Sequence, residues 1–219
     1  VPHTRTLVAR VDDIARGAAL MTGTTFTRRF IDGTADLLPN AVLEQALYRN
    51  LCDAPAPVYT ADEQAFAAAL NATCPPSEQL PGFAAKVDPA LREQIRQASG
   101  NGTAALNAFV MPYVHSDLQQ PGSTDVGDVS WQTPTAQITT VTWPSLTPGH
   151  SWQVVSAGKS GIAQKGMLYA AQVLAATAVD LLTQPQLLAD ARAEYAAASA
   201  AGYVCPIEPD AVPVPVSQL

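Results

Sequence analysis

The sequence predicts an α/β fold, and two pairs of neighbouring segments carry this prediction. An amphipathic run over residues 4–20 precedes a run rich in Thr, Phe and Ile over residues 21–32. Later, a β-branched run over residues 135–143 precedes a long apolar run over residues 162–182. Apolar residues three and four apart indicate a helix, and β-branched or aromatic residues in alternation indicate a strand. A helix next to a strand is half of an α+β unit, so we expect helices packed on a sheet.

The first pair places its apolar residues on one face of each segment. Leu7, Val11 and Ile14 recur at helical spacing, which predicts a helix that covers a sheet. Phe26 and Phe30 share one face of the strand that follows, because side chains alternate along a strand. We expect the other half of this unit upstream of the first residue of the chain.

Local capping signals predict the helices of the central region. A break at residues 38–40 precedes a helix over residues 43–51, and we expect a second domain to begin there. Thr60 and Glu63 have the spacing of a capping box, in which two side chains bond the first backbone N–H groups of a helix. Asp88 stands directly before a proline and is expected to cap another helix.

The composition argues against several classes of partner. With 12 basic against 19 acidic residues, the chain lacks the basic stripe that phosphate backbones demand, so we expect no nucleic-acid partner. Lys, Gln, Asp and Thr interrupt the apolar stretches, so we expect no membrane span.

Cys52, Cys74 and Cys205 lack the spacing of a zinc cluster and are interpreted as free thiols, with a disulfide between Cys52 and Cys74 as the alternative. We expect a cytoplasmic protein, with the periplasm as the alternative location.

Two polar loops, residues 122–130 and 147–152, are the most informative motifs. His150 follows a Pro-Gly turn and precedes a Ser-Trp pair, a setting that exposes the imidazole. An exposed imidazole serves as a metal ligand or an acid–base group, although a single loop histidine is also commonly only solvated. A catalytic zinc needs at least three protein ligands, and His3 and His115 lie in unrelated contexts. Any metal site must therefore take its other ligands from elsewhere.

Carboxylates and hydroxyls gather in the first of these loops. Asp125 and Asp128 stand three apart at the start of a predicted helical turn, with Ser123 or Thr124 available as the cap. One interpretation is that the carboxylates only stabilise the positive end of that turn. The other is a polar wall for a substrate, in which hydroxyls and N–H groups meet an anionic group. Asn40 is likewise either a turn residue or part of a site.

These motifs stand in a longer block that resembles a known enzyme family. Residues 122–182 contain GSTDVGDVSWQTPTAQ and TPGHSWQVVSAGKSGIAQKGMLYAAQVLAATAVDLL, and residues 8–24 read VARVDDIARGAALMTGT. The block resembles the C-terminal catalytic half of bacterial p-aminobenzoyl-glutamate hydrolases, in the two-metal aminoacylase and carboxypeptidase amidohydrolase superfamily. Residues 8–24 are similar to the end of that family's lid domain, so the resemblance covers nearly the whole chain.

The resemblance implies an α/β architecture, namely the C-terminal half of a three-layer metallopeptidase catalytic domain with a mixed sheet and flanking helices. The last helix and strand of an α+β lid domain precede it. The implied parts are the end of the lid or dimerisation domain at 1–35, the catalytic half at 36–204, and a proline-rich tail at 205–219.

The resemblance also implies metal-dependent hydrolysis of the amide bond of N-acyl amino acids such as p-aminobenzoyl-glutamate. His150 matches the family's late histidine ligand. Asp125 matches the acidic position of the active-site loop, where Ser123 and Thr124 are the neighbouring candidates for substrate binding, and Asn40 matches loosely an Asn that follows Pro. The implied cofactors are two divalent ions, zinc or manganese. The general base and the other ligands are expected in the missing N-terminal half.

The implied partners follow from that missing half. The chain is expected to act only with the N-terminal half of the same enzyme or with a second chain, as a homo- or heterodimer, on a small N-acyl amino acid. The alternative is a non-catalytic fragment, or a dimerisation or binding domain, that retains the amidohydrolase scaffold.

Overall fold

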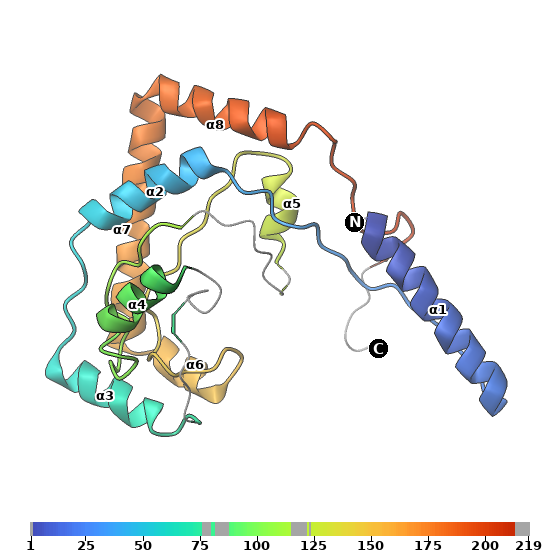
Figure 1. Cartoon of the computed structure of the whole chain (residues 1–219), viewed down its shortest axis with the longest axis horizontal. Coiled ribbons are helices and arrows are strands. Elements are labelled where there is room, and N and C mark those ends of the chain that lie inside the picture. The colour runs from blue at the N-terminus through green and yellow to red at the C-terminus, as the bar shows by residue number, and fades with distance from the viewer. Residues whose placement is uncertain (1, 76–79, 82–87, 115–121, 123, 213–219) are drawn as a thin grey trace. The chain divides into compact units, whose positions relative to one another are not determined.

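The structure is a computed structural model, and it describes residues 2–75, 80–81, 88–114, 122 and 124–212 (Figure 1). In this part of the chain the helices are α1 (Pro2–Thr22), α2 (Ala41–Asp53), α3 (Ala61–Asn71), α4 (Pro89–Ala98), α5 (Val126–Ser130), α6 (Trp152–Gly158), α7 (Gly161–Thr183) and α8 (Pro185–Ala198).

The chain divides into two compact units. Unit 1 comprises Val1–Asn40, Leu118–Thr135 and Ala191–Leu219. Unit 2 comprises Ala41–Asp117 and Ala136–Asp190. Unit 1 therefore contains α1 and α5, and unit 2 contains α2, α3, α4, α6 and α7.

The predicted α/β fold is wrong. The described residues form helices, turns and irregular segments, with no strand and therefore no mixed sheet or three-layer domain. The runs over 21–32 and 135–143, both predicted as strands, are irregular beyond the end of α1 at Thr22. A strand needs a neighbouring strand to bond its N–H and C=O groups, and no described segment provides that pairing.

The core of unit 2 explains what the β-branched run does instead. One buried cluster joins α2 to α7 and consists of Leu47, Tyr169 and Val173. A second buried cluster consists of Ala67, Leu106 and Ile162. Ile138 packs against the first cluster and Val141 against the second, so the apolar side chains of the run cover helices. β-branched residues favour a partly buried surface, and both a strand and an irregular segment packed on helices provide one. The composition of residues 135–143 therefore did not distinguish the two.

Segment 136–143 approaches α7 so closely that only glycine fits at one point. A Cβ atom on Gly166 would collide with the carbonyl oxygen of Val141. The Thr140 hydroxyl donates a 3.0 Å hydrogen bond to the Gly166 carbonyl. The missing side chain thus lets the two backbones meet.

The capping predictions are confirmed. Thr60 Oγ1 accepts a bond from Glu63 N at 3.2 Å, and Thr60 N donates to Glu63 Oε2 at 2.7 Å, which completes the capping box of α3. Glu63 Oε2 also pairs with Lys165 Nζ of α7 at 2.6 Å. Asp88 Oδ1 accepts from Ala90 N at 2.7 Å and so caps α4.

The apolar stripe of α1 does not cover a sheet. The helix itself is confirmed, yet Val11 is 62% exposed and Ile14 is 71% exposed. Charged groups hold α1 within unit 1, because Arg5 donates to the Cys205 carbonyl at 2.8 Å and Asp12 pairs with Arg28 at 3.0 Å.

By length and composition, α7 could cross a membrane, contrary to the expectation from the sequence. Its apolar window has a mean hydropathy of 1.4, and 22% of that window is buried. The core helix of a soluble protein can meet the same two criteria, so the finding does not assign a membrane location.

Candidate functional site

The predicted site residues fall in both units. Asn40, Thr124 and Asp125 lie in unit 1, and His150 lies in unit 2. Ser123 lies outside the described residues. The structure therefore describes one candidate region in each unit, the loop before α5 in unit 1 and the loop before α6 in unit 2.

The loop before α5 leaves its acidic side chain exposed. Asp125 holds the N-cap position of α5 but makes no capping hydrogen bond with its side chain. The Thr124 hydroxyl accepts a 3.3 Å bond from Val126 N, so it bonds one of the first N–H groups of the turn. Asp125 and Thr124 are both exposed and are open to a ligand.

Asp128 has a structural role that its neighbour lacks. Its Oδ2 accepts a 3.2 Å bond from Ala35 N, and its Oδ1 accepts a 2.7 Å bond from the Tyr203 hydroxyl. The bond to Asp128 is the largest cause of a raised pKa of Tyr203, with burial next in order. The sequence predicted the same possible roles for Asp125 and Asp128, but Asp128 is the one whose side chain joins distant segments of unit 1.

Further bonds fix the chain around α5. Ser130 accepts from Leu38 N at 2.8 Å, and the Trp131 ring N–H donates to the Asp36 carbonyl at 2.9 Å. A Cβ on Gly127 would collide with the Ala35 carbonyl oxygen, so glycine permits this close approach. These contacts are non-local, and the sequence offered only one signal for them, a Trp whose N–H needs a partner.

Asn40 is buried in unit 1, where its side chain bonds a distant segment of the chain. The residue is 2% exposed, and its Nδ2 donates a 2.9 Å bond to the Ala191 carbonyl of α8. A buried amide with a backbone partner stabilises the fold, because an unpaired buried polar group is costly. The structure thus favours the interpretation of Asn40 as a structural residue.

His150 is exposed, as the Pro-Gly turn predicts, and its backbone adopts the left-handed conformation with φ of 57°. Directly after it, Ser151 caps α6, because its hydroxyl accepts from Val154 N at 3.4 Å. The same hydroxyl donates to the Pro148 carbonyl at 2.7 Å, which closes the loop. The imidazole therefore projects from a well-bonded turn.

The metal-ligating side chains of the described residues do not gather around His150. Within the described ranges, no group of three or more His, Cys, Asp or Glu side chains could hold a metal ion. Cys52, Cys74 and Cys205 are free thiols, so the alternative of a disulfide is not found. The described part of the chain offers single donors and no complete coordination site.

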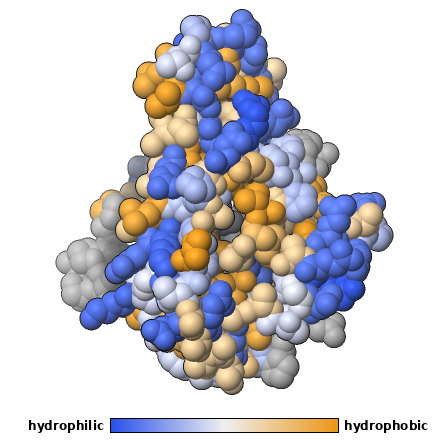
Figure 2. All heavy atoms as spheres, turned by 90° about the vertical axis from the view of Figure 1, so that its left-hand side faces the viewer, coloured by the Kyte–Doolittle hydropathy of each residue, from blue (hydrophilic) through white to orange (hydrophobic). Residues whose placement is uncertain are grey.

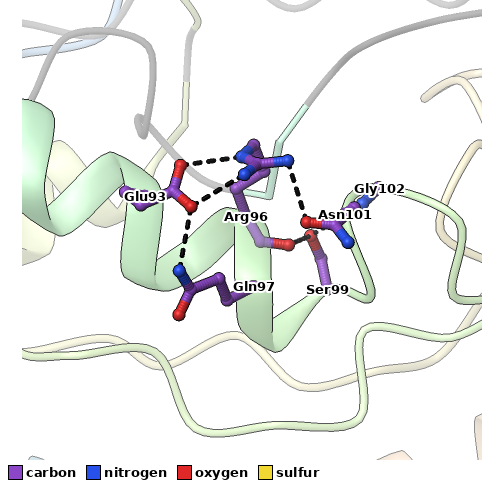
Figure 3. A network of polar contacts seen from close by, with 6 residues as sticks. All are labelled: Glu93, Arg96, Gln97, Ser99, Asn101 and Gly102. Carbon is purple, nitrogen blue, oxygen red and sulfur yellow. Dashed lines mark hydrogen bonds and ion pairs between the residues drawn. The ribbon is translucent and has the colours of Figure 1, made fainter.

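A polar network at the end of α4 was missed by sequence reasoning (Figure 3). Glu93 and Arg96 point toward one another and form two bonds of 2.7 and 2.8 Å, and Gln97 donates to Glu93 at 2.9 Å. Arg96 lowers the pKa of Glu93 to about 2, with Gln97 as the second cause. Arg96 also donates to Asn101 Oδ1 at 2.8 Å. These groups bond one another, so the network stabilises the helix end.

The comparisons with known proteins bear on the same loops, because the match spans nearly the whole chain. No family model matches the chain, and no solved structure matches it. Among curated proteins, the chain matches a p-aminobenzoyl-glutamate hydrolase subunit of Escherichia coli (strain K12). The two are 37% identical over 225 residues, which is 94% of this chain.

The chain is similar to a p-aminobenzoyl-glutamate hydrolase subunit. The resemblance stated from the sequence motifs is thereby confirmed. The chain spans 43% of the length of this hydrolase subunit, so more than half of the relative has no counterpart here.

Proposed function

We propose that this chain is part of a hydrolase that cleaves the amide bond of N-acyl amino acids such as p-aminobenzoyl-glutamate, and that it acts together with the rest of that enzyme. The observation that carries the proposal is 37% identity, across 94% of the chain, to a protein named as a subunit of p-aminobenzoyl-glutamate hydrolase. The reaction adds water across the amide bond and releases p-aminobenzoate and glutamate.

The exposed loops support roles for particular residues. Thr124 and Asp125 stand exposed before α5, and we propose that they and the neighbouring Ser123 contact the substrate. For Asn40 the same role is supported only by the loose match of the motif, because this residue is 2% exposed and bonded to α8.

The described residues do not by themselves fit a pair of divalent ions. One exposed imidazole cannot hold a catalytic zinc, which needs three protein ligands and an open position. No cluster within the described ranges supplies the others. We propose that His150 contributes one ring nitrogen to a zinc or manganese site that residues outside this chain complete.

Two preparations test the proposal, the chain alone and the full-length polypeptide in which this sequence stands. With p-aminobenzoyl-glutamate as the probe, we expect release of p-aminobenzoate by the full-length protein and none by the chain alone. A full-length protein that is folded but hydrolyses no N-acyl amino acid would contradict the proposal. That outcome would favour the alternative of a non-catalytic binding or dimerisation scaffold.

A further inference from the structure

α7 is apolar on the side that points away from the core of unit 2. Its inner face consists of the buried residues Ile162, Gly166, Tyr169, Val173 and Thr177. Its outer face consists of Met167, Leu168, Leu174, Val179 and Leu182, which are 51% to 84% exposed. The inner residues follow one another at three- and four-residue spacing, which marks a single side of the helix. The outer residues lie on the opposite side of the helix, among alanines and Gln172.

The outer face carries no charge. Asp180 is the only charged residue between Gly166 and Thr183, and it accepts a 2.7 Å bond from Asn50 Nδ2 of α2. This carboxylate therefore belongs to the packed side. Figure 2 shows apolar residues interspersed with polar ones on one face of the molecule. A helix that is apolar on all sides is normally buried on all sides.

We infer that the outer face of α7 is a docking surface for the remainder of the hydrolase polypeptide, which contributes an apolar, uncharged protein surface. This inference rests on the proposed function, because it takes the chain to be part of a larger hydrolase. The hydrolase relative extends over more than twice the matched length, since the match covers 43% of it. That additional polypeptide is an occupant of sufficient size for a face that runs the length of α7.

A lipid bilayer is a poorer occupant because of what α7 holds on its inner face. Asn50 of α2 donates to both Asp180 and Thr177, and the Tyr169 hydroxyl donates to the Leu51 carbonyl at 2.6 Å. Inserting α7 would draw α2 toward the hydrocarbon with its charged residues, which include Glu44, Arg49 and Asp53. Charged side chains in the bilayer core cost several kcal/mol each, whereas an apolar protein surface carries no such cost.

Cysteine accessibility tests the inference on proteins that are intact. Leu174→Cys is placed in the chain alone and in the full-length hydrolase, and the rate of maleimide labelling at that position is measured by peptide mass spectrometry. We expect labelling in the full-length protein to be about tenfold slower or more, because a buried thiol is inert. Val155→Cys on α6, where Val155 is 78% exposed, is the matched control for reagent access.

Each other outcome overturns the inference. Rates at Leu174→Cys within about twofold of each other in the two proteins would show that nothing covers the face. A uniform slowing at both positions would show that the protection is not specific to α7. Protection of the chain alone that grows with its concentration would assign the face to a second copy, and protection only with phosphatidylglycerol vesicles would assign it to lipid.

The labelling experiment tests the docking surface and the activity assay tests the proposed function, so each proposal can be refuted without the other. A full-length protein that protects Leu174→Cys but hydrolyses no N-acyl amino acid would refute the proposed function and leave the docking surface intact. An active hydrolase that leaves Leu174→Cys fully reactive would refute the docking surface alone.

Discussion

The hydroxyl of Tyr203 donates a 2.7 Å hydrogen bond to Asp128, which lies 75 residues earlier in the chain. The second oxygen of the same carboxylate accepts a bond from Ala35 N. One side chain thus connects three segments of unit 1. Its neighbour Asp125, three residues earlier on the same loop, is exposed and makes no capping bond. The loop therefore separates a structural carboxylate from one that is open to a ligand.

Asp128→Asn should lower the pKa of Tyr203 toward its ordinary value of 10, because the bond to Asp128 is the first cause of its rise. A raised folded-state pKa means that this stabilisation is fully present below pH 10 and is lost as pH rises through the folded value. Ultraviolet titration of tyrosinate measures the shift, with Tyr203→Phe identifying its signal. Asp125→Asn is the control, and equal titrations in both variants would contradict the assignment.

Glu63→Gln should reduce stability at neutral pH and have less effect in acid. The bond from Lys165 is the first cause that lowers the pKa of Glu63 below its ordinary value of 4.5. A lowered pKa gives stabilisation that is present above pH 4.5 and is lost as pH falls through the folded value. Urea midpoints of both proteins across this range give the comparison. Asp62→Asn, an exposed neighbour, should change the midpoint less, and a pH-independent effect of Glu63→Gln would count against the ion pair.

Gly166→Ala should destabilise the chain by about 1–3 kcal/mol, which is the usual cost of forcing an extra atom into a packed site. The added Cβ would collide with the Val141 carbonyl oxygen, and the backbone there cannot move as a flexible side chain could. Gly158→Ala, in open space at the end of α6, should be neutral or stabilising by up to about 1 kcal/mol. Urea unfolding measures both. Equal midpoints for the two variants would show that the close approach is absent.

His150→Asn should reduce the activity of the full-length enzyme by orders of magnitude without changing its unfolding midpoint. Asn removes the imidazole but tolerates the left-handed backbone, with φ of 57°, that His150 adopts. Alanine is a less clean substitution, because it lacks the short polar side chain that lets Asn offset, by local hydrogen bonding, the cost of about 1–2 kcal/mol of a left-handed residue. His3→Asn, also exposed, is the control and should remain active. Near-normal turnover of His150→Asn would remove its proposed role as a ligand.

The purified chain alone should bind zinc weakly or not at all. Among the described residues, no three His, Cys, Asp or Glu side chains lie close enough together to hold a metal ion. A single imidazole binds zinc with little affinity, because a catalytic zinc needs three protein ligands. Metal analysis after dialysis, with the full-length protein prepared in parallel, measures the content. A tight, stoichiometric two-metal site in the isolated chain would contradict this expectation.

Local signals predicted the helices well. The Thr60–Glu63 box and Asp88 each act within one helical turn, so the sequence alone contains the whole interaction. The periodic run over 162–182 is likewise confirmed as α7. These signals succeed because they involve residues close together in the chain.

The sheet was predicted wrongly because strand pairing is not a local property. Ile138 and Val141 have the composition of a strand, yet they bury themselves on helices without a ladder partner among the described residues. The sequence also indicated the exposure of His150 but not the left-handed backbone that positions it. The roles of Asp128 and Asn40 depend on hydrogen-bond partners that lie 75 and 151 residues away in the sequence. Sequence patterns that relate residues within one helical turn cannot identify such partners.

The close approach of Gly127 to the Ala35 carbonyl limits which substitutions the chain can accept at position 127. Thr124 and Asp125 are exposed, whereas a Cβ atom at position 127 would collide with the carbonyl oxygen of Ala35. Natural variants should therefore keep glycine there, or alter both segments together. An exposed position that tolerates substitution thus lies two residues before one that requires glycine.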